Sequence, residues 1–224
     1  MKVNKISKRL CTASSYVRDG AVVADIGTDH AYLPIHLAQI GKIKKAYACD
    51  INEGPLKKAQ ENIYKYSLGN VIETRLQDGL KGIDDLAPTD IIICGMGGEL
   101  IISIIENSRY VRQKGIRLIL QPMTFVKELR KYLSKEFFTI AENIVCEDGK
   151  LYQILCVEYD GVGKSLSNLE LELGEKNLMN KGPELDKLVF STIAKKQKIF
   201  DGLLKGGYDT SIIEAEIKEL EKLV

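Results

Sequence analysis

Acidic side chains end two apolar segments near the start of the chain. Asp25 closes the run that begins at Val22, and Asp50 closes the run that begins at Ala46. Gly27 comes two residues after Asp25, where a residue without a side chain lets a ligand approach the backbone. This pattern is typical of a βαβ unit that binds adenosine, in which the second acid accepts hydrogen bonds from the ribose hydroxyls. A helix cap is the structural alternative for Asp50.

The loop after Asp25 departs from the dinucleotide-binding pattern G-x-G-x-x-G. Only its first glycine, Gly27, is present, and Thr28, Asp29 and His30 follow. A pyrophosphate at this helix N-terminus would meet the Asp29 carboxylate, and the two anions would repel each other. A ligand with adenosine, no phosphate and a cationic centre fits better, which predicts S-adenosyl-L-methionine as the cofactor. Asp25 then accepts from its ammonium group or from a ribose hydroxyl.

Two later loops complete the predicted cofactor site. Asp78 follows the third expected strand and is placed to accept from the exocyclic amine of adenine, with an Asp-Gly turn as the structural alternative. The glycines of segment 95–98 surround Met96 and let a flat ring lie against the backbone, unless they serve helix–strand packing. The predicted cofactor contacts are Asp25, Gly27, Asp50, Ile51, Asn52, Gln77, Asp78, Gly79, Gly95 and Met96.

Acid–base groups occur in the first of these loops. Asp29 and His30 are predicted to be catalytic, because both ionise and both lie beside the expected methyl donor. Tyr32 and Gly97 are predicted to contact the substrate. A lone histidine is also compatible with a purely structural role, so that alternative stays open for His30. The spacing of histidine and cysteine does not suit a metal site, and no metal is expected.

A basic segment follows the fourth strand. Residues 109–135 carry eight Lys and Arg side chains against one acid, Glu128. Such a segment either neutralises phosphates along an RNA strand or forms a solvated face. On the first interpretation, Arg112, Arg130 and Lys131 bind the substrate. A second basic group near the N-terminus comprises Lys2, Lys5, Lys8 and Arg9.

Alternating strands and helices must position these residues. The expected strands are 21–26, 45–50, 71–76, 90–94 and 116–121, and the expected helices are 4–18 and about 32–40, 53–66, 98–107 and 124–134. The strands are nearly continuous apolar runs, which is typical of a sheet covered by helices on both faces. Segments 136–146 and 151–159 then predict an antiparallel hairpin. The expected fold class is α/β, a class I methyltransferase Rossmann-like seven-stranded sheet.

The composition changes near Asp160, where helix formers replace strand formers. Pro183 begins one expected helix and Gly206 ends it, before a last helix that closes the chain. Together they predict a coiled-coil-like helical hairpin that carries a weaker basic cluster, Lys195–Lys198. The expected domains are residues 1–160, which bind the cofactor and fold alone, and residues 161–224, which bind RNA.

Composition sets further limits. A hydrophobic content of 45% and a net charge of +1 are ordinary for a globular protein. No apolar run reaches the roughly 18 residues of a membrane span, so no membrane association is expected. The five cysteines are odd in number and scattered, which predicts buried thiols in a reducing cytoplasm.

Four motifs occur together: DIGTDHAYLP from Asp25, DINEGP from Asp50, RLQDGL from Arg75 and GMGG from Gly95. They resemble the bacterial tRNA adenine-N1 methyltransferases that modify nucleotide 22 in the D-arm region, and the resemblance covers essentially the whole chain. It implies S-adenosyl-L-methionine as methyl donor, tRNA as substrate and partner, and N1-methyladenine as product. The aromatic motif of amino-directed adenine methyltransferases is absent after the fourth strand, which favours ring-nitrogen chemistry. We expect a monomer in the cytoplasm.

Two other functions stay open at this point. A small-molecule methyltransferase would use the C-terminal hairpin for dimerisation or to gate its substrate. An RNA-binding or partner-binding module would retain only a degenerate nucleotide site, but intact acids at three strand ends argue against it.

Overall fold

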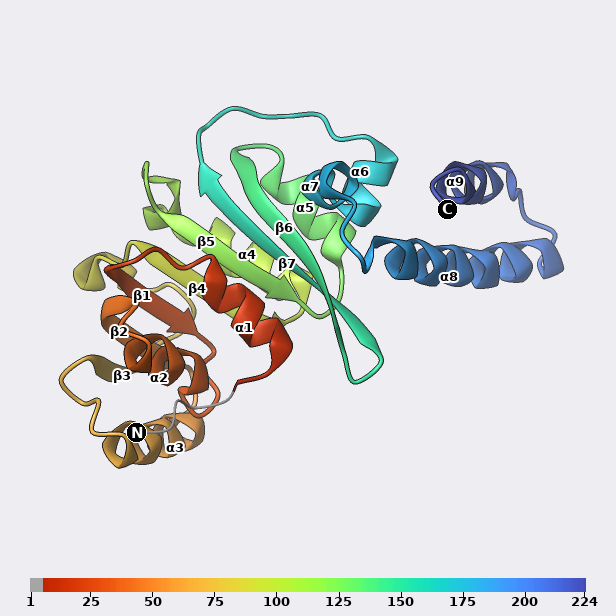
Figure 1. Ribbon diagram of the computed structural model, residues 1–224. Helices are drawn as coiled ribbons and strands as arrows, with labels where there is room; N and C mark the ends of the chain where they lie inside the picture. The colour runs from red at the N-terminus through yellow and green to blue at the C-terminus, as the bar shows by residue number, and fades with distance from the viewer. Residues whose placement is uncertain (1–5) are drawn as a thin grey trace.

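The computed structural model describes residues 6–224, which form one seven-stranded sheet flanked by helices (Figure 1). The strands are β1 (Ala21–Ile26), β2 (Ile43–Asp50), β3 (Ile72–Leu76), β4 (Asp90–Met96), β5 (Arg117–Pro122), β6 (Phe137–Glu147) and β7 (Lys150–Tyr159). Their order is β3-β2-β1-β4-β5-β7-β6, and β7 runs antiparallel to both of its neighbours. The carboxyl ends of the parallel strands β1 to β5 therefore meet at one edge. The predicted fold class is confirmed.

The helices follow the predicted order, with additions. They are α1 (Lys8–Ser15), α2 (Tyr32–Gln39), α3 (Glu53–Lys65), α4 (Gly98–Glu106), α5 (Val126–Leu133), α6 (Asn168–Leu173), α7 (Glu175–Asn180), α8 (Leu185–Lys205) and α9 (Ser211–Glu221), with 3-10 turns η1 (Ile83–Leu86) and η2 (Tyr110–Arg112). The expected first helix, 4–18, is shorter, and its first two positions lie outside the described residues. The short helices α6 and α7 were not predicted, because six residues are too few to show a helical period.

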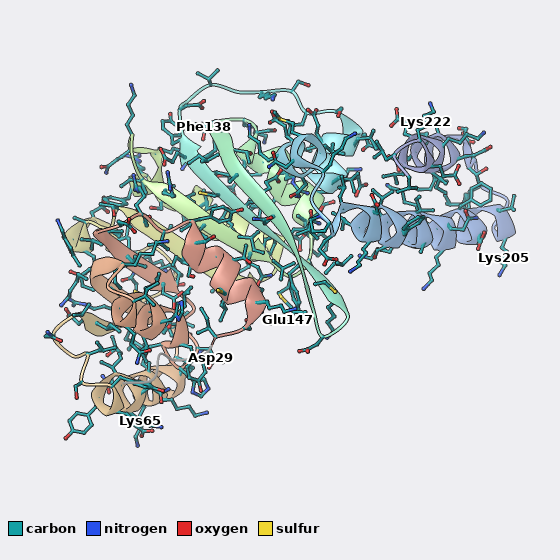
Figure 2. The ribbon with its side chains drawn as sticks, viewed as in Figure 1. Asp29, Lys65, Phe138, Glu147, Lys205 and Lys222 are labelled. Carbon is teal, nitrogen blue, oxygen red and sulfur yellow. The ribbon has the colours of Figure 1, made fainter. Side chains whose placement is uncertain are left out.

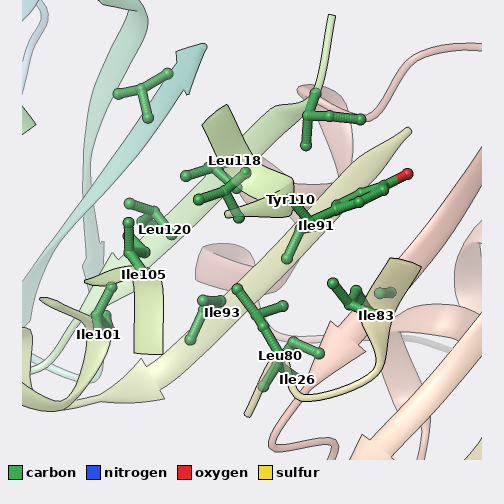
Figure 3. Close-up of a cluster of buried hydrophobic side chains, with 14 of the residues drawn as sticks. Ile26, Leu80, Ile83, Ile91, Ile93, Ile101, Ile105, Tyr110, Leu118 and Leu120 are labelled. Atoms are coloured by element: carbon green, nitrogen blue, oxygen red, sulfur yellow. The ribbon is translucent and has the colours of Figure 1, made fainter. Parts of the chain in front are cut away.

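Side chains of the central strands alternate between two apolar cores. Ile91 and Ile93 of β4 face the core that α4 and α5 cover, whereas Ile92 faces the core that α1, α2 and α3 cover. Figure 3 shows the first core, in which Ile101 and Ile105 of α4 also pack. All five side chains are fully buried, and burial of each contributes about 1.5–3 kcal/mol. The two cores hold the strand ends in place from both faces.

A helical hairpin of α8 and α9 extends from one end of the sheet (Figure 1). At its base, Leu185 and Leu188 of α8 pack with Leu220 of α9 and Leu173 of α6 in a third, smaller core. Ile144 of β6 packs against this core as well. The predicted C-terminal hairpin is therefore present, and its base rests on the β6–β7 end of the sheet.

The boundary predicted after Asp160 does not separate two packing units, because α6 and α7 lie against α5 and β6. Arg130 of α5 is only 3% exposed and donates hydrogen bonds to two carbonyl oxygens of α6, each at 3.1 Å. Glu142 of β6 pairs with Arg130 at 2.7 Å and accepts from the backbone N–H of Lys176 at 3.0 Å. Residues 1–160 alone would leave these buried charges uncovered. The geometry gives no support to the expectation that they fold alone.

Gly174 provides a test of this packing. It joins α6 to α7 with a φ of +93°, and an added Cβ would lie 2.4 Å from a carboxylate oxygen of Glu142. We expect Gly174→Ala to lower the free energy of unfolding by about 2–4 kcal/mol, because it strains the backbone and displaces a buried ion pair. Gly182→Ala is the control, since nothing lies within 4 Å of its added Cβ. Chemical denaturation measures both, and equal stability of the two variants would contradict this prediction.

Candidate active site

The carboxyl ends of β1 and β4 open onto a cavity of about 510 Å³. Its walls include Asp25, Gly27, Asp29 and Tyr32 from β1 and the segment after it, and Cys94 from β4. The first turn of α1 forms another side, and Figure 2 shows Asp29 close to α1 in this view. The structure therefore brings Asp25, Gly27, Asp29 and Tyr32 together in one cavity, whereas His30 is not among the residues that line it.

Asp25 is an ionisable side chain in an apolar place. It is 7% exposed, and its Oδ2 accepts a hydrogen bond from the Thr28 hydroxyl at 2.7 Å. Burial raises the pKa of Asp25 to about 6, the nearby charge of Asp50 adds to the rise, and the Thr28 hydrogen bond opposes it. A carboxylate accepts several hydrogen bonds, so Asp25 can also bind a cationic group that enters the cavity.

Gly27 has a backbone conformation that other residues rarely adopt. Its φ is +73°, and an added Cβ would lie 2.1 Å from the terminal methyl of Met96. That flexible side chain can move, but the positive φ would stay strained with any side chain at this position. The backbone N–H groups of Gly27 and Thr28 donate to the carbonyl oxygen of Cys49 at 2.8 and 2.9 Å. These bonds tie the loop to β2 and fix its shape.

The residues after this glycine form a strained and braced loop. His30 and Ala31 have φ values of +61° and +56°, in the left-handed region. His30 Nε2 lies 3.0 Å from the Asp29 carboxylate, and its ring stacks on Tyr32 with centroids 5.2 Å apart. Asn62 of α3 donates to the His30 carbonyl oxygen at 3.0 Å. Such strain persists only where neighbours enforce it, and it is concentrated at functional sites.

Asp50 ends β2 next to this loop. Its Oδ1 accepts from the backbone N–H of Asn52 at 2.8 Å in a turn that precedes α3, and both Ile51 and Asn52 are exposed. The N-cap of α3 is Asn52, whose side chain makes no cap hydrogen bond, so Asp50 is not a helix cap. The N–H of Gln77 donates to the Asp50 carbonyl oxygen at 2.9 Å, so the ends of β2 and β3 are adjacent. Because a carboxylate has two oxygens, this turn bond does not exclude ribose binding by the same side chain.

The cofactor contacts predicted after the third strand lie beside a separate hollow. Gln77 and Asp78 line a space of about 350 Å³, and Lys81 lines it with them. The Asp78 carboxylate forms an ion pair with Lys81, and the side-chain amide of Gln77 donates to the Gly79 carbonyl oxygen at 2.9 Å. These residues share the sheet edge with Asp25 without sharing its cavity. A ligand amine would compete with Lys81 for Asp78.

The glycines after β4 have different roles. Gly98 donates to the Thr124 carbonyl oxygen at 2.9 Å, and an added Cβ would lie 2.4 Å from the Phe125 carbonyl oxygen. Gly98 therefore serves backbone packing, which is the structural alternative. Gly97 lies against a side chain instead, since its added Cβ would lie 3.2 Å from Thr124 Oγ1. Gly95 has a φ of +81° and more room, with the nearest atom 3.9 Å from its added Cβ.

Arg9 is a cavity residue that sequence reasoning did not select, and Gln121 holds its side chain. Arg9 lines the cavity and donates to Oε1 of the fully buried Gln121 at 2.7 Å. Its guanidinium also lies 5.7 Å from the ring centroid of Tyr152 and 3.9 Å from Glu147. The available signals were weak: Arg9 belongs to a basic group, and Gln121 is a polar residue at the end of an apolar strand.

The basic segment 109–135 does not form one exposed cationic face. The prediction that Arg130 binds the substrate is wrong, because its guanidinium is buried in the ion pair beneath α6. Arg112 is half-buried, pairs with Glu136 at 2.9 Å and donates to two backbone carbonyl oxygens. Lys131 is exposed and stays a predicted substrate contact. The sequence shows where charge lies, but it does not show which charges are buried.

Lys2 and Lys5 lie outside the described residues. The prediction of buried cysteines is confirmed for Cys49 and Cys156 and is wrong for Cys11, which is exposed, while Cys94 and Cys146 are half-buried. Among residues 6–224, no three His, Cys, Asp or Glu side chains lie where they could hold a metal ion. In the same part of the chain, no helix has both the length and the apolar character needed to cross a membrane.

Comparison with known proteins gives the family. Residues 6–155 match the model of a methyltransferase domain. The tRNA (adenine(22)-N(1))-methyltransferase of Bacillus subtilis is 35% identical over 225 residues, which cover 96% of this chain and 92% of the relative. The chain belongs to the tRNA (adenine(22)-N(1))-methyltransferase family.

Solved structures of the family share nearly the whole fold. The B. subtilis m1A22 tRNA methyltransferase TrmK has a TM-score of 0.83 at 34% identity, covering 98% of this chain and 95% of its own. M. capricolum TrmK, solved with the cofactor product S-adenosyl-homocysteine, has a TM-score of 0.82 at 31% identity, covering 97% and 96%. Such coverage means that the similarity includes the C-terminal helices as well as the sheet.

The raised pKa of Asp25 makes a prediction about stability. The folded-state pKa of Asp25, about 6, lies above its unfolded value. The free energy of unfolding therefore falls as the pH rises from the unfolded pKa to about 6, and it stays low at higher pH. Asp25→Asn keeps an acceptor for Thr28 and removes the charge, so we expect it to raise the free energy of unfolding at pH 7.5 by about 1–3 kcal/mol. The difference should shrink toward pH 4. Denaturant unfolding at both pH values measures this, and a variant less stable than the wild type at pH 7.5 would contradict it.

Proposed function

We propose that this protein transfers a methyl group from S-adenosyl-L-methionine to N1 of adenine 22 in tRNA. The observation that carries the proposal is the cavity at the ends of β1 and β4, where a buried acid, a glycine turn and a strained loop meet. Similarity to tRNA (adenine(22)-N(1))-methyltransferases along almost the entire chain supports the choice of substrate.

The residues at this edge fit the cofactor. When bound, S-adenosyl-L-methionine supplies a methyl group on a positively charged sulfur. Asp25 would bind its ammonium group, because a cation offsets part of the free energy that the ionised carboxylate loses on burial. Asp50 would accept from the ribose hydroxyls, with the exposed Ile51 beside it for the adenine ring. Asp78 would accept a hydrogen bond from the adenine amine, which would replace its ion pair with Lys81.

The substrate side of the site needs alignment more than a strong base. N1 of adenine has a lone pair at neutral pH, so the residues must orient the base and exclude water. Asp29, His30 and Tyr32 would do this, and the contacts of His30 with the Asp29 carboxylate and the Tyr32 ring support the assignment. Methylation leaves the base cationic, and the Asp29 carboxylate, 80% exposed, can stabilise that charge. Since N1 lies on the pairing edge, the base must be unpaired to enter.

The rest of a tRNA requires cationic side chains outside the cavity. Lys131 of α5 and Lys195 and Lys198 of α8 are exposed and can contact phosphates. We assign the helical hairpin this role, and we propose that the protein acts as a monomer in the cytoplasm. Such a hairpin reaches along a folded RNA that a single cavity does not span.

The proposed reaction has a direct test. The full-length protein, incubated with a tRNA transcript carrying adenine 22 and isotope-labelled S-adenosyl-L-methionine, is expected to produce labelled 1-methyladenosine. A transcript with guanine at position 22 is the control and should stay unlabelled. Nucleoside mass spectrometry separates the methyladenosine isomers. Label in N6-methyladenosine would contradict the proposal, and the absence of label from the tRNA would contradict it and favour a small-molecule methyltransferase.

A further inference from the structure

One lysine of the basic cluster on α8 is buried, although its neighbours are not. Lys195 and Lys198 are exposed, whereas Lys196 is 8% exposed. Its Nζ lies 2.7 Å from Oε1 of Glu172 in α6 and 2.7 Å from Oε2 of Glu216 in α9. Lys196 therefore faces the helices at the base of the hairpin and is not available to RNA phosphates.

Lys127 of α5 completes a cluster of two positive and two negative side chains. Its Nζ lies 2.9 Å from Glu172 Oε1 and donates to Asn168 Oδ1 at 2.7 Å. Asn168 in turn donates to Glu216 Oε1 at 2.9 Å. The cluster thus joins α5, which covers the sheet, to α6 and to both helices of the hairpin.

The central pair of this cluster stays charged at neutral pH. Burial alone would raise the pKa of Glu172, but hydrogen bonds from Lys196 and Lys127 outweigh burial and lower it. Burial would likewise lower the pKa of Lys196, and the bonds to Glu172 and Glu216 raise it instead. The bonds between α8 and its neighbours are therefore short, charged and directional.

Directional bonds matter here because of the length of α8. The apolar side chains at the base of the hairpin attract one another through a non-directional force, so the bonds of Lys196 restrict the angle of the hairpin further. Beyond Lys196, α8 continues to Lys205, a distance of about 14 Å at the rise of an α-helix. Figure 2 shows Lys205 at the far tip of the hairpin. A small tilt at the base would therefore displace every phosphate contact along the hairpin.

We propose that Lys196 is a positioning residue for tRNA. Through Glu172 and Glu216 it fixes the angle of the hairpin relative to the sheet domain, so that the hairpin and the cavity engage one tRNA together. This inference rests on the proposed function, because it takes the hairpin to be a tRNA-binding surface. Buried ion pairs of this kind can specify an arrangement while adding little stability, since desolvation offsets their attraction.

The test uses the full-length enzyme with a charge-balanced variant. Lys196→Met alone leaves an unpaired buried acid, whereas Lys196→Met with Glu216→Gln removes one charge of each sign and leaves Lys127 paired with Glu172. We expect the KM for tRNA to rise about tenfold or more in the double variant, because the two binding surfaces are misaligned. Its kcat, its Kd for S-adenosyl-homocysteine and its Tm should stay close to wild-type values. Lys195→Met, at the exposed neighbouring position, is the comparison for loss of a direct phosphate contact, which weakens tRNA binding and reduces its salt dependence.

Two outcomes would overturn the inference. One is a double variant with a wild-type KM for tRNA or with a loss of folding, since Lys196 would then have no positioning role or a purely structural one. The other is a Lys196→Met variant whose tRNA binding loses as much salt dependence as that of Lys195→Met, since Lys196 would then contact phosphate directly. Small-angle scattering should also show a wider range of hairpin orientations in the double variant. That readout needs no methylation, so it distinguishes failure of this inference from failure of the proposed function.

Discussion

The charge of Asp25 is the constraint on which the rest of this site depends. The carboxylate lies inside the protein at the end of β1, where burial raises its pKa to about 6. Ionisation at neutral pH therefore opposes folding, and the cores on both faces of the sheet must keep the strand end in place. The Thr28 hydroxyl and the backbone bonds to Cys49 fix the loop around it. In the proposed function, this loss of stability keeps a negative charge in position before the cationic group of the cofactor binds.

Buried charge also connects the sheet to the C-terminal helices. The pair of Arg130 and Glu142 joins α5 and β6 to α6, and the cluster around Lys196 joins α5 and α6 to α8 and α9. Helix α5 belongs to both sets, and the loop before it packs on Gly98 beside the cavity. The hairpin is thus continuous with the sheet domain through a chain of charged contacts. We regard the C-terminal helices as part of one binding surface for a large substrate.

Much of this architecture follows from periodicity and strand-end residues. The apolar runs at β1, β2 and β4 predicted a sheet covered on both faces, and the acid, glycine and loop after β1 do share one cavity. Sequence patterns were less informative where tertiary contacts decide whether a charged side chain is buried or exposed. Arg130 and Lys196 look like exposed lysines and arginines of a basic segment, but acids distant in sequence neutralise both inside the protein. The cavity wall formed by Arg9 was missed for a similar reason, since it depends on how α1 lies against Gln121.

The central claim is that Asp25 is kept as a buried anion for the cationic group of the cofactor. Carbon-detected NMR of the protein labelled with ¹³C in its aspartate carboxyl groups measures the claim directly, with Asp25→Asn identifying the resonance. The account predicts a pKa near 6 for Asp25 in the free protein and a markedly lower pKa with S-adenosyl-L-methionine bound, because a cation favours the ionised form. A pKa that is unchanged or higher in the complex would show that Asp25 does not face the positive charge, and it would contradict the account.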